Sequence, residues 1–447
     1  MPQVRAFRGI HYALDRFGAN EVPGSVRLPD EPPLAAGRRL ADLTDVVCPP
    51  FDVISPEQQA ALLARHPRNA VRLELSAGPD PHAAAAQALA DWLADGILER
   101  RAEASVYYYS HATRQNPDEP TVQGVLARVL LEPFGGDVRA HEHTMPGPKA
   151  DRLALLMATR TQLSPILAVY FDRSDRYRHV MSRAWGDEWR ARDDDGLLHA
   201  VAAVEPDDRL LNYLGRQRMF IADGHHRYET ALAYQAEVRS DPRWADAEPG
   251  SLAADWIMVV LVNAELEELE ILATHRLVVR ADAAALSALA DGDPMFRATP
   301  VEAASLSARL EELREAHRPV FGLVLPGDQA WLLEADADAL AERMRRERTS
   351  TAVRRLDLAA LHAAILGDRL GIDAEAVAAG DRLAYTRNEA DARAAVSRGE
   401  ASAAFLVRPT PLEQLAEVAS VGDVMPQKST YFYPKLLTGF VFNPLED

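Results

Sequence analysis

Two patterns of apolar residues alternate along this chain, and each predicts a different secondary structure. Short continuous apolar runs bounded by turn residues are typical of buried strands, whereas apolar positions three or four residues apart are typical of helices. The clearest case is a strand ending with Met219 to Ile221, a turn permitted by Gly224, and a helix in the periodic segment that follows. Because the two patterns alternate throughout, we expect a multi-domain α/β (α+β) fold.

The same patterns place the other predicted elements. Helices are predicted at 82–98, 151–160, 207–217, 301–317, 337–347 and 356–370. Strands are predicted at 69–75, 138–144, 164–171, 196–204, 255–265 and 402–407, with shorter strand-like runs within 4–12 and 45–54. Hairpins are predicted from 105–113 with 122–131, and from 320–325 with 330–336.

These elements divide the chain into three predicted parts. An N-terminal mixed α/β region covers 1–135, a middle part covers 136–275, and a C-terminal α/β region covers 276–447. The tail of the last part is rich in aromatic residues, which a tail in solution would rarely carry. We therefore expect it to pack back on the core.

The charge of the chain limits the partners that it can bind. Its 67 acidic and 49 basic residues give a formal net charge of −18, which opposes binding to nucleic acid or to anionic lipid. No apolar run reaches the length of a membrane span, and the N-terminus lacks a signal-peptide pattern. The single cysteine, Cys48, favours a reducing cytoplasm. A small-molecule partner is expected, and a homo-oligomer stays open.

Lysine is rare in this chain. Of the 49 basic residues only Lys149, Lys428 and Lys435 are lysines, and the other 46 are arginines. Arginine replaces lysine readily in surface ion pairs but not where a compact ammonium group is needed. The three lysines are therefore candidate functional residues, although chance retention of each is the alternative.

The strongest motif runs from Asp223 to Arg227, with the sequence Asp-Gly-His-His-Arg. The predicted strand and helix place His225, His226 and Arg227 at a helix N-terminus, where backbone N–H groups and the helix dipole attract anions. Gly224 permits the sharp turn. The motif predicts a phosphate-binding site. The alternative is an aspartate cap followed by incidental histidines.

A second motif lies at 139–144, with the sequence Arg-Ala-His-Glu-His-Thr. On a strand, Arg139, His141 and His143 would share one face, and Glu142 and Thr144 the other. Glu142 is a candidate general base among basic groups. A solvated polar loop is the alternative.

Metal binding is a further reading of the histidines. His141, His143 and His225 could form a zinc triad, although their spacing is not diagnostic. Lys149 and Arg152 follow the second motif and are candidate substrate-binding residues.

The third motif is the tail at 425–435, which contains Lys428, Ser429, Thr430 and Lys435 among aromatic residues. These groups could close over a phosphate or a carboxylate, and a purely structural strap is the alternative. Weaker signals are the Thr-His-Arg trio at 274–276 and Cys48, which we interpret as a buried small hydrophobe. Neither a Walker A motif nor a GxGxxG fingerprint is present.

Together these motifs resemble a widespread prokaryotic family, the domain of unknown function 1015 family. The resemblance rests on CPPFDVIS, HEHT followed by GPKADRL, DGHHRYETALAY, THRLV and MPQKSTYFYPK, which span about residues 45 to 442. The family name implies no activity.

The segment 136–240 also resembles, more distantly, the ParB/sulfiredoxin superfamily, one branch of which contains free-serine kinases. The resemblance implies a ParB/sulfiredoxin-like, nucleotide-binding core at 136–275. It implies that Gly224, His225, His226 and Arg227 hold nucleotide phosphates and that Glu142, which matches the kinase glutamate by position, is the base.

The function predicted from the sequence is therefore a small-molecule kinase. It would transfer a phosphoryl group from ADP or ATP to a hydroxyl acceptor, with free L-serine as the leading candidate. Asp223 would hold Mg²⁺, and Lys428 would neutralise the transferred group. Thr144 would bind phosphate. The remaining candidates would bind the substrate, and they are His141, His143, Lys149, Arg152 and Lys435. A nucleotide-binding switch without turnover and a metal-dependent hydrolase are the alternatives.

Overall fold

The computed structural model of the chain describes residues 2–18, 39–142, 146–174, 187–314, 316 and 318–446. Contacts divide it into two units. Unit 1 comprises Met1–Arg139, Thr144–Glu270 and Pro434–Asp447, and unit 2 comprises Ala140–His143 and Ile271–Tyr433. The mixed α/β fold expected from the sequence is confirmed in both units. The division into three parts stays a prediction.

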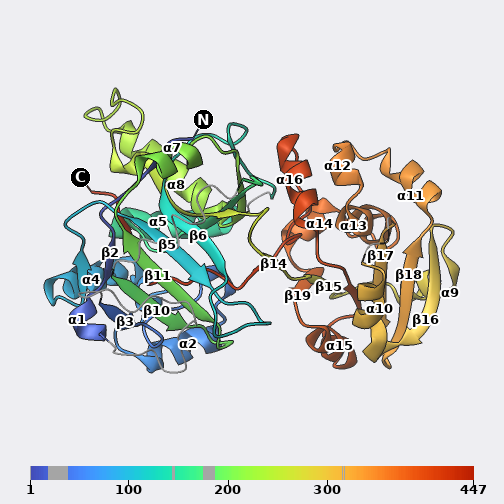
Figure 1. The fold of residues 1–447 in the computed structure, drawn as a ribbon. Coiled ribbons are helices and arrows are strands. Elements are labelled where there is room, and N and C mark those ends of the chain that lie inside the picture. Colours follow the sequence, from blue (N-terminus) through green and yellow to red (C-terminus); the bar gives the residue numbers. More distant parts are fainter. Residues whose placement is uncertain are drawn as a thin grey trace. The chain divides into compact units, whose positions relative to one another are not determined.

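Unit 1 is built on a mixed sheet. Its strand order in the described residues is β3-β10-β11-β5-β6-β13-β9-β12-β7, and β1 pairs with β6. In Figure 1 the green β10 and β11 lie beside the cyan β5 and β6. The strands are β1 (Val4–Arg5), β3 (Leu40–Asp42), β5 (Val106–His111), β6 (Val122–Leu130), β7 (Val138–Arg139), β9 (Ile166–Tyr170), β10 (Glu188–Arg192), β11 (Leu198–Val204), β12 (Met219–Asp223) and β13 (Trp256–Asn263).

The core of this sheet lies at β13, which pairs antiparallel with β6 and parallel with β9. All eight residues of β13 are buried, as their continuous apolar sequence predicts. The hairpin of β5 and β6 is also confirmed. Burial of both faces at this point fixes the neighbouring strands β9 and β12, which lead to the candidate site.

The helices of unit 1 begin at recognisable caps. Asp80 caps α4 and Asp207 caps α7, in each case by accepting a hydrogen bond from a first-turn N–H group. α5 packs against both α4 and α8. The helices are α1 (Leu14–Phe17), α2 (Pro56–Arg65), α3 (Val71–Glu74), α4 (Pro81–Ala94), α5 (Pro146–Thr159), α7 (Asp208–Leu214) and α8 (His225–Ser240); two small ladders pair β2 (Ile10–Tyr12) with β4 (Leu98–Arg100) and β8 (Thr161–Gln162) with β22 (Asn443–Pro444).

Unit 2 contains an antiparallel sheet with the order β16-β18-β17-β20-β15-β19. Leucines and alanines of α10 and α15 pack with β17 and β20 in one buried cluster, so these two helices cover one face. The strands are β15 (His275–Val278), β16 (Phe296–Glu302), β17 (Val320–Leu325), β18 (Gln329–Ala335), β19 (Leu383–Thr386) and β20 (Ala403–Leu406). The short β14 (Glu270–Ile271) and β21 (Phe432–Tyr433) lie where the chain passes between units.

The helices of unit 2 are interspersed with the strands of its sheet along the chain. They are α9 (Ala283–Gly292), α10 (Leu306–Glu312), α11 (Ala337–Met344), α12 (Thr351–Arg354), α13 (Asp357–Ala360), α14 (Ala374–Ala379), α15 (Glu389–Ser397) and α16 (Leu412–Ser420). A π-helical turn, Leu361–Gly367, continues α13, so the helix predicted at 356–370 is confirmed with a wider last part.

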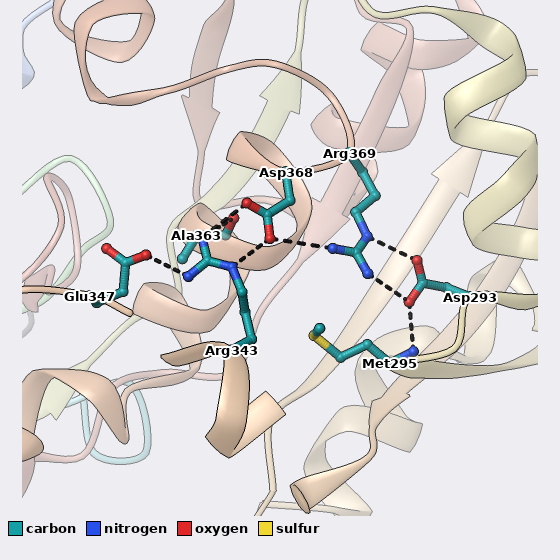
Figure 2. A network of polar contacts seen from close by, with 7 residues as sticks. All are labelled: Asp293, Met295, Arg343, Glu347, Ala363, Asp368 and Arg369. Carbon is teal, nitrogen blue, oxygen red and sulfur yellow. Dashed lines mark hydrogen bonds and ion pairs between the residues drawn. The ribbon is translucent and has the colours of Figure 1, made fainter. Parts of the chain in front are cut away.

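A network of ion pairs joins the helical layer of unit 2, and Figure 2 shows it from close by. Arg343 of α11 donates to both oxygens of Asp368 at 2.5 and 2.9 Å and pairs with Glu347 at 2.6 Å. Arg369 donates to both oxygens of Asp293 at 2.9 and 3.2 Å. These bidentate pairs fix the end of the π-helical turn against α11 and the α9–β16 connection.

Several sequence predictions were wrong in detail. The run 69–75 is not a strand but contains the helical turn α3, because the Asn69 side chain bonds the carbonyls of Asp45 and Val47 and accepts from the N–H of Val71. The run 45–54 forms a 3-10 turn rather than a strand. Both runs are short and rich in apolar residues, and such runs do not distinguish a strand from a buried turn.

Three boundaries also differ. The strand predicted at 138–144 ends at Arg139, where the chain leaves unit 1. α5 begins at Pro146 rather than Asp151, because proline is well suited to the first turn of a helix. The helix predicted at 301–317 is preceded by β16, whose last residues still pair with β18, so α10 begins only at Leu306.

No helix among the residues that the structure describes is both long enough and apolar enough to cross a membrane.

Candidate functional site

The junction between β12 and α8 turns at a single residue, Gly224. Its φ of 95° lies in the left-handed region, and a Cβ atom there would lie 2.6 Å from Cγ2 of Ile166. Only glycine accepts both conditions without strain. The N-cap residue of α8 is Gly224 itself, which has no side chain to cap the first turn, and a helix N-terminus of this kind is a potential anion-binding site.

A β-bulge precedes this turn. Ile221 pairs with Ala168 and Asp223 pairs with Leu167, which leaves Ala222 as an extra residue on β12. Bulges change the direction of the side chains that follow them and are frequent beside functional sites. Here the bulge sets the direction of Asp223, the last residue of the strand.

Asp223 holds two cations at the turn. Arg227 donates to its Oδ2 at 2.6 Å, and Lys435 of the tail forms an ion pair with its Oδ1. Burial raises the pKa of Asp223, but Lys435 and Arg227 outweigh burial and hold the pKa well below its usual range. Two cations against one carboxylate leave the turn with a positive excess, in a chain whose formal net charge is −18.

The first turn of α8 also carries the two histidines of the motif. His225 is buried and His226 is half-buried. Thr230 donates to the carbonyl of His226 at 2.8 Å, which ties the second turn to the first. Lys149 of α5 forms an ion pair with Glu229 of α8. All these groups come from one strand–turn–helix element and from the α5 helix packed against it.

In unit 2 the tail lies along the second motif. Glu142 forms a β-bridge with Met425, whose N–H donates to the carbonyl of His141 at 2.8 Å. The N–H of Lys428 donates to Oε1 of Glu142 at 3.3 Å, and the side chains of His141 and Thr430 share a hydrogen bond of 3.0 Å. The candidate base and one of the three lysines are therefore brought together.

A buried arginine, Arg276, supports this arrangement. It is fully buried, and it donates to the carbonyls of Thr274, Gln427 at 2.9 Å and Lys428 at 3.1 Å. Its guanidinium carbon lies 5.5 Å from the centre of the Tyr385 ring. Burial lowers the pKa of Arg276 to about 10, against opposite effects of Tyr385 and Glu142. The guanidinium thus fixes the backbone of the tail at 427–428.

The backbone of Lys428 is strained as a consequence. Its φ is 56°, in the left-handed region that residues other than glycine rarely occupy. Such conformations persist where surrounding contacts determine them, and they concentrate at functional sites. Here two hydrogen bonds hold the backbone of Lys428: Arg276 donates to its carbonyl, and Glu142 accepts from its N–H.

The predicted site residues fall into two groups. Arg227 and Lys435 meet at Asp223, and Lys428 meets Glu142. Unit 1 holds Lys149, Arg152, Asp223, Gly224, His225, His226, Arg227 and Lys435; unit 2 holds His141, Glu142 and Lys428; His143 and Thr144 lie outside the described residues. The sequence carries only a weak signal for Arg276, as part of the Thr-His-Arg trio at 274–276, because its burial cannot be predicted from the sequence.

The described residues do not support the predicted zinc and Mg²⁺ sites. Among the described residues no group of three or more histidine, cysteine, aspartate or glutamate side chains could hold a metal ion. His141 and His225 belong to different units, and His143 is not described. Both oxygens of Asp223 are engaged by cations, which does not fit the Mg²⁺ role predicted for it.

Comparison with protein families gives one match. The model of the family described as "Protein of unknown function (DUF1015)" matches residues 33–359. No curated protein matches the chain.

Comparison with solved structures gives distant likenesses. A conserved hypothetical protein from Pyrococcus furiosus is 13% identical with a TM-score of 0.34, over 67% of this chain and 89% of that chain. A free serine kinase in complex with AMP is 12% identical with a TM-score of 0.32, over 66% and 83%. SbnI with a C-terminal truncation from Staphylococcus aureus is 10% identical with a TM-score of 0.35, over 70% and 85%. These values are too low to transfer a function to this chain.

Proposed function

The chain belongs to the family described as "Protein of unknown function (DUF1015)", a description that states no activity, and we propose from its own residues that it is a small-molecule kinase. The donor is ADP or ATP, and the acceptor is a hydroxyl compound, with free L-serine as the first candidate. The single observation that carries this proposal is the turn at Gly224, where the N-terminus of α8 meets the cations Arg227 and Lys435.

The turn has the features that phosphate groups require. Backbone N–H groups at a helix start and nearby cations bind phosphate oxygens together. The lack of a side chain at Gly224 lets the turn pack directly against Ile166 of β9, which fixes the start of α8. Asp223 holds Arg227 and Lys435 in place before a ligand arrives, so little ordering cost remains. His225 and His226 are proposed to complete the contacts to the phosphates.

The proposed reaction is a direct phosphoryl transfer. The acceptor oxygen attacks the terminal phosphorus, the bond to the bridging oxygen breaks, and the shortened nucleotide leaves with that electron pair. The proton of the acceptor hydroxyl goes to Glu142, the proposed general base. Lys428 is proposed to neutralise charge on the transferred group. We also propose that residues 136–275 form a ParB/sulfiredoxin-like, nucleotide-binding core.

Ligand binding is tested by thermal unfolding of the full chain with AMP, ADP, ATP or inorganic phosphate, each with and without Mg²⁺. A ligand at about 100 times its Kd adds about 2.7 kcal/mol of stability, which is a shift of several degrees. Lys435→Met should reduce the shift, because it removes one of the two cations at Asp223. If no nucleotide shifts the wild-type Tm at millimolar concentration, the phosphate-binding assignment is wrong.

Turnover is tested by formation of phosphoserine from L-serine and ADP or ATP. Glu142→Gln keeps the shape of the side chain and removes its basicity, so turnover should fall by about 10²–10⁴ with little change in nucleotide affinity. Glu413→Gln, at an exposed position of unit 2, is the matched control and should retain full activity. Nucleotide binding without any phosphorylated product, for serine and other hydroxyl compounds, would instead support the switch protein.

A further inference from the structure

A cavity of about 60 Å³ in unit 1 borders the phosphate turn. One water molecule needs about 10–15 Å³ on this measure, so the cavity has room for a small ligand. The wall is largely apolar and includes Leu155, Leu163 and Ile257. Arg227 belongs both to this wall and to the turn, so the cavity and the proposed phosphate site share a side chain.

Three further segments of the chain contribute side chains to the wall. Phe51 belongs to the proline-rich run at 45–54, and Glu74 to the run at 69–75. Arg152 comes from α5. Thus segments that are far apart in the sequence contribute side chains to one cavity.

Both arginines of the wall are already compensated. Arg152 forms an ion pair with Asp151, donates to the backbone carbonyl of Glu74 at 2.8 Å and lies over the Phe51 ring at 4.5 Å. Arg227 is held by the aspartate of the turn, as described above. Each guanidinium therefore already has a carboxylate partner beside the cavity.

Glu74 is the uncompensated polar group of the wall. Its side chain belongs to a residue only 3% exposed. Oε1 accepts from the Ser164 hydroxyl at 3.4 Å, but Oε2 has no hydrogen-bond partner among the described residues. Burial raises the pKa of Glu74, while Arg152 and Arg227 act in the opposite direction. Buried polar groups normally have a hydrogen-bond partner, so Oε2 calls for a donor, which a ligand in the cavity would supply.

We propose that this cavity binds a small primary amine, whose ammonium group donates to Oε2 of Glu74 while its aliphatic part packs against the leucines of the wall. The position of Arg227 makes this amine the phosphoryl acceptor, so the acceptor class is an amino alcohol or hydroxy amino acid. The assignment as acceptor rests on the proposed function, whereas amine binding itself does not.

Other ligand classes fit the cavity less well. An anion without an ammonium group would meet Glu74 and two guanidinium groups that are already paired. A metal ion would find one carboxylate oxygen, and the described residues offer no group of ligands around it. A neutral alcohol would donate a weaker hydrogen bond than an ammonium group does, because charge assistance strengthens the bond to a carboxylate.

The test is calorimetric titration of the full chain, without nucleotide, with n-butylamine and with 1-butanol. These probes have the same carbon chain and differ in the donor group. A charge-assisted hydrogen bond predicts that the amine binds about 10- to 100-fold more tightly than the alcohol. Ethanolamine and L-serine are titrated next, as candidate acceptors. Equal affinity for the two butyl probes, or no amine binding, would overturn the proposal even where Glu74→Gln fails to fold.

Variants locate the bound amine. Glu74→Gln should abolish the preference for n-butylamine over 1-butanol, whereas Glu103→Gln, which removes an exposed carboxylate of unit 1, should retain it. An unchanged preference in folded Glu74→Gln would show that the amine binds elsewhere. If the amine binds but no nucleotide shifts the Tm, the cavity assignment holds and the phosphate site is rejected. If a nucleotide shifts the Tm but the amine does not bind, the phosphate site holds and the cavity assignment is rejected.

Discussion

Gly224→Ala is the change that tests the phosphate turn most directly. The added Cβ atom would lie 2.6 Å from Cγ2 and 3.0 Å from Cβ of Ile166, both on the buried strand β9. The φ of 95° would in addition place an alanine in the left-handed region. The cost of left-handed backbone is about 1–2 kcal/mol and that of overpacking is about 1–3 kcal/mol, so we expect a loss of about 2–5 kcal/mol.

Gly78 provides a matched control. Its φ is 117°, but a Cβ atom there would have nothing within 4 Å. Gly78→Ala therefore measures the backbone cost alone, and its difference from Gly224→Ala measures the clash with Ile166. The assay is urea unfolding followed by tryptophan fluorescence, together with the thermal shift caused by nucleotide. The shift should be lost in Gly224→Ala, because the start of α8 must move, and retained in Gly78→Ala.

The result that would refute this reasoning is a small difference between the two variants. If their unfolding free energies agree within about 0.5 kcal/mol, the accuracy expected of such comparisons, the contact with Ile166 does not restrict the turn. If Gly224→Ala is destabilised but binds nucleotide normally, the turn is needed for folding and the phosphate assignment fails.

Three further changes test the surroundings of the two groups. Because Lys435 and Arg227 outweigh burial and depress the pKa of Asp223, its stabilising contribution is complete above about pH 4 and is lost as the pH falls; acid unfolding of the wild type should therefore be steeper than that of Asp223→Asn. Lys428→Gly should be about 1 kcal/mol more stable than Lys428→Ala in thermal unfolding, since glycine accepts a φ of 56°, and equal stability would contradict the left-handed backbone. Arg276→Leu removes the donor to three carbonyl groups and should cost about 3 kcal/mol or more, with faster hydrogen exchange across 425–430; slow exchange there would show that the tail is held by other contacts.

The turn could be predicted from the sequence because its determinants are local. A continuous apolar strand, a glycine and a periodic helix follow one another within 219–239, and each step restricts the next. The same is true of β13 and of both predicted hairpins, which are confirmed. In each case the neighbours along the chain contain the information that decides the structure.

The rest of the site depends on contacts between distant segments. Glu74 lies in an apolar run that looked like a strand, and its hydroxyl partner Ser164 is 90 residues away. The second motif has the alternation of a strand, but the chain leaves the sheet after Arg139, and Glu142 pairs with Met425 instead. A period of two residues predicts which side chains share a face, but it does not say which segment will supply the neighbouring strand.

The presence of lysine rather than arginine has a physical reason at one of the three lysine positions. Lys149 is about one-third exposed and pairs with a glutamate, a place where arginine would serve as well. At Lys428 the unusual feature is the backbone, which glycine or asparagine would tolerate better. Lys435 differs, because Arg227 already occupies Oδ2 of Asp223 and only Oδ1 is available. A compact ammonium group pairs with a single oxygen, whereas a second planar guanidinium would favour both oxygens and displace Arg227 from the phosphate turn.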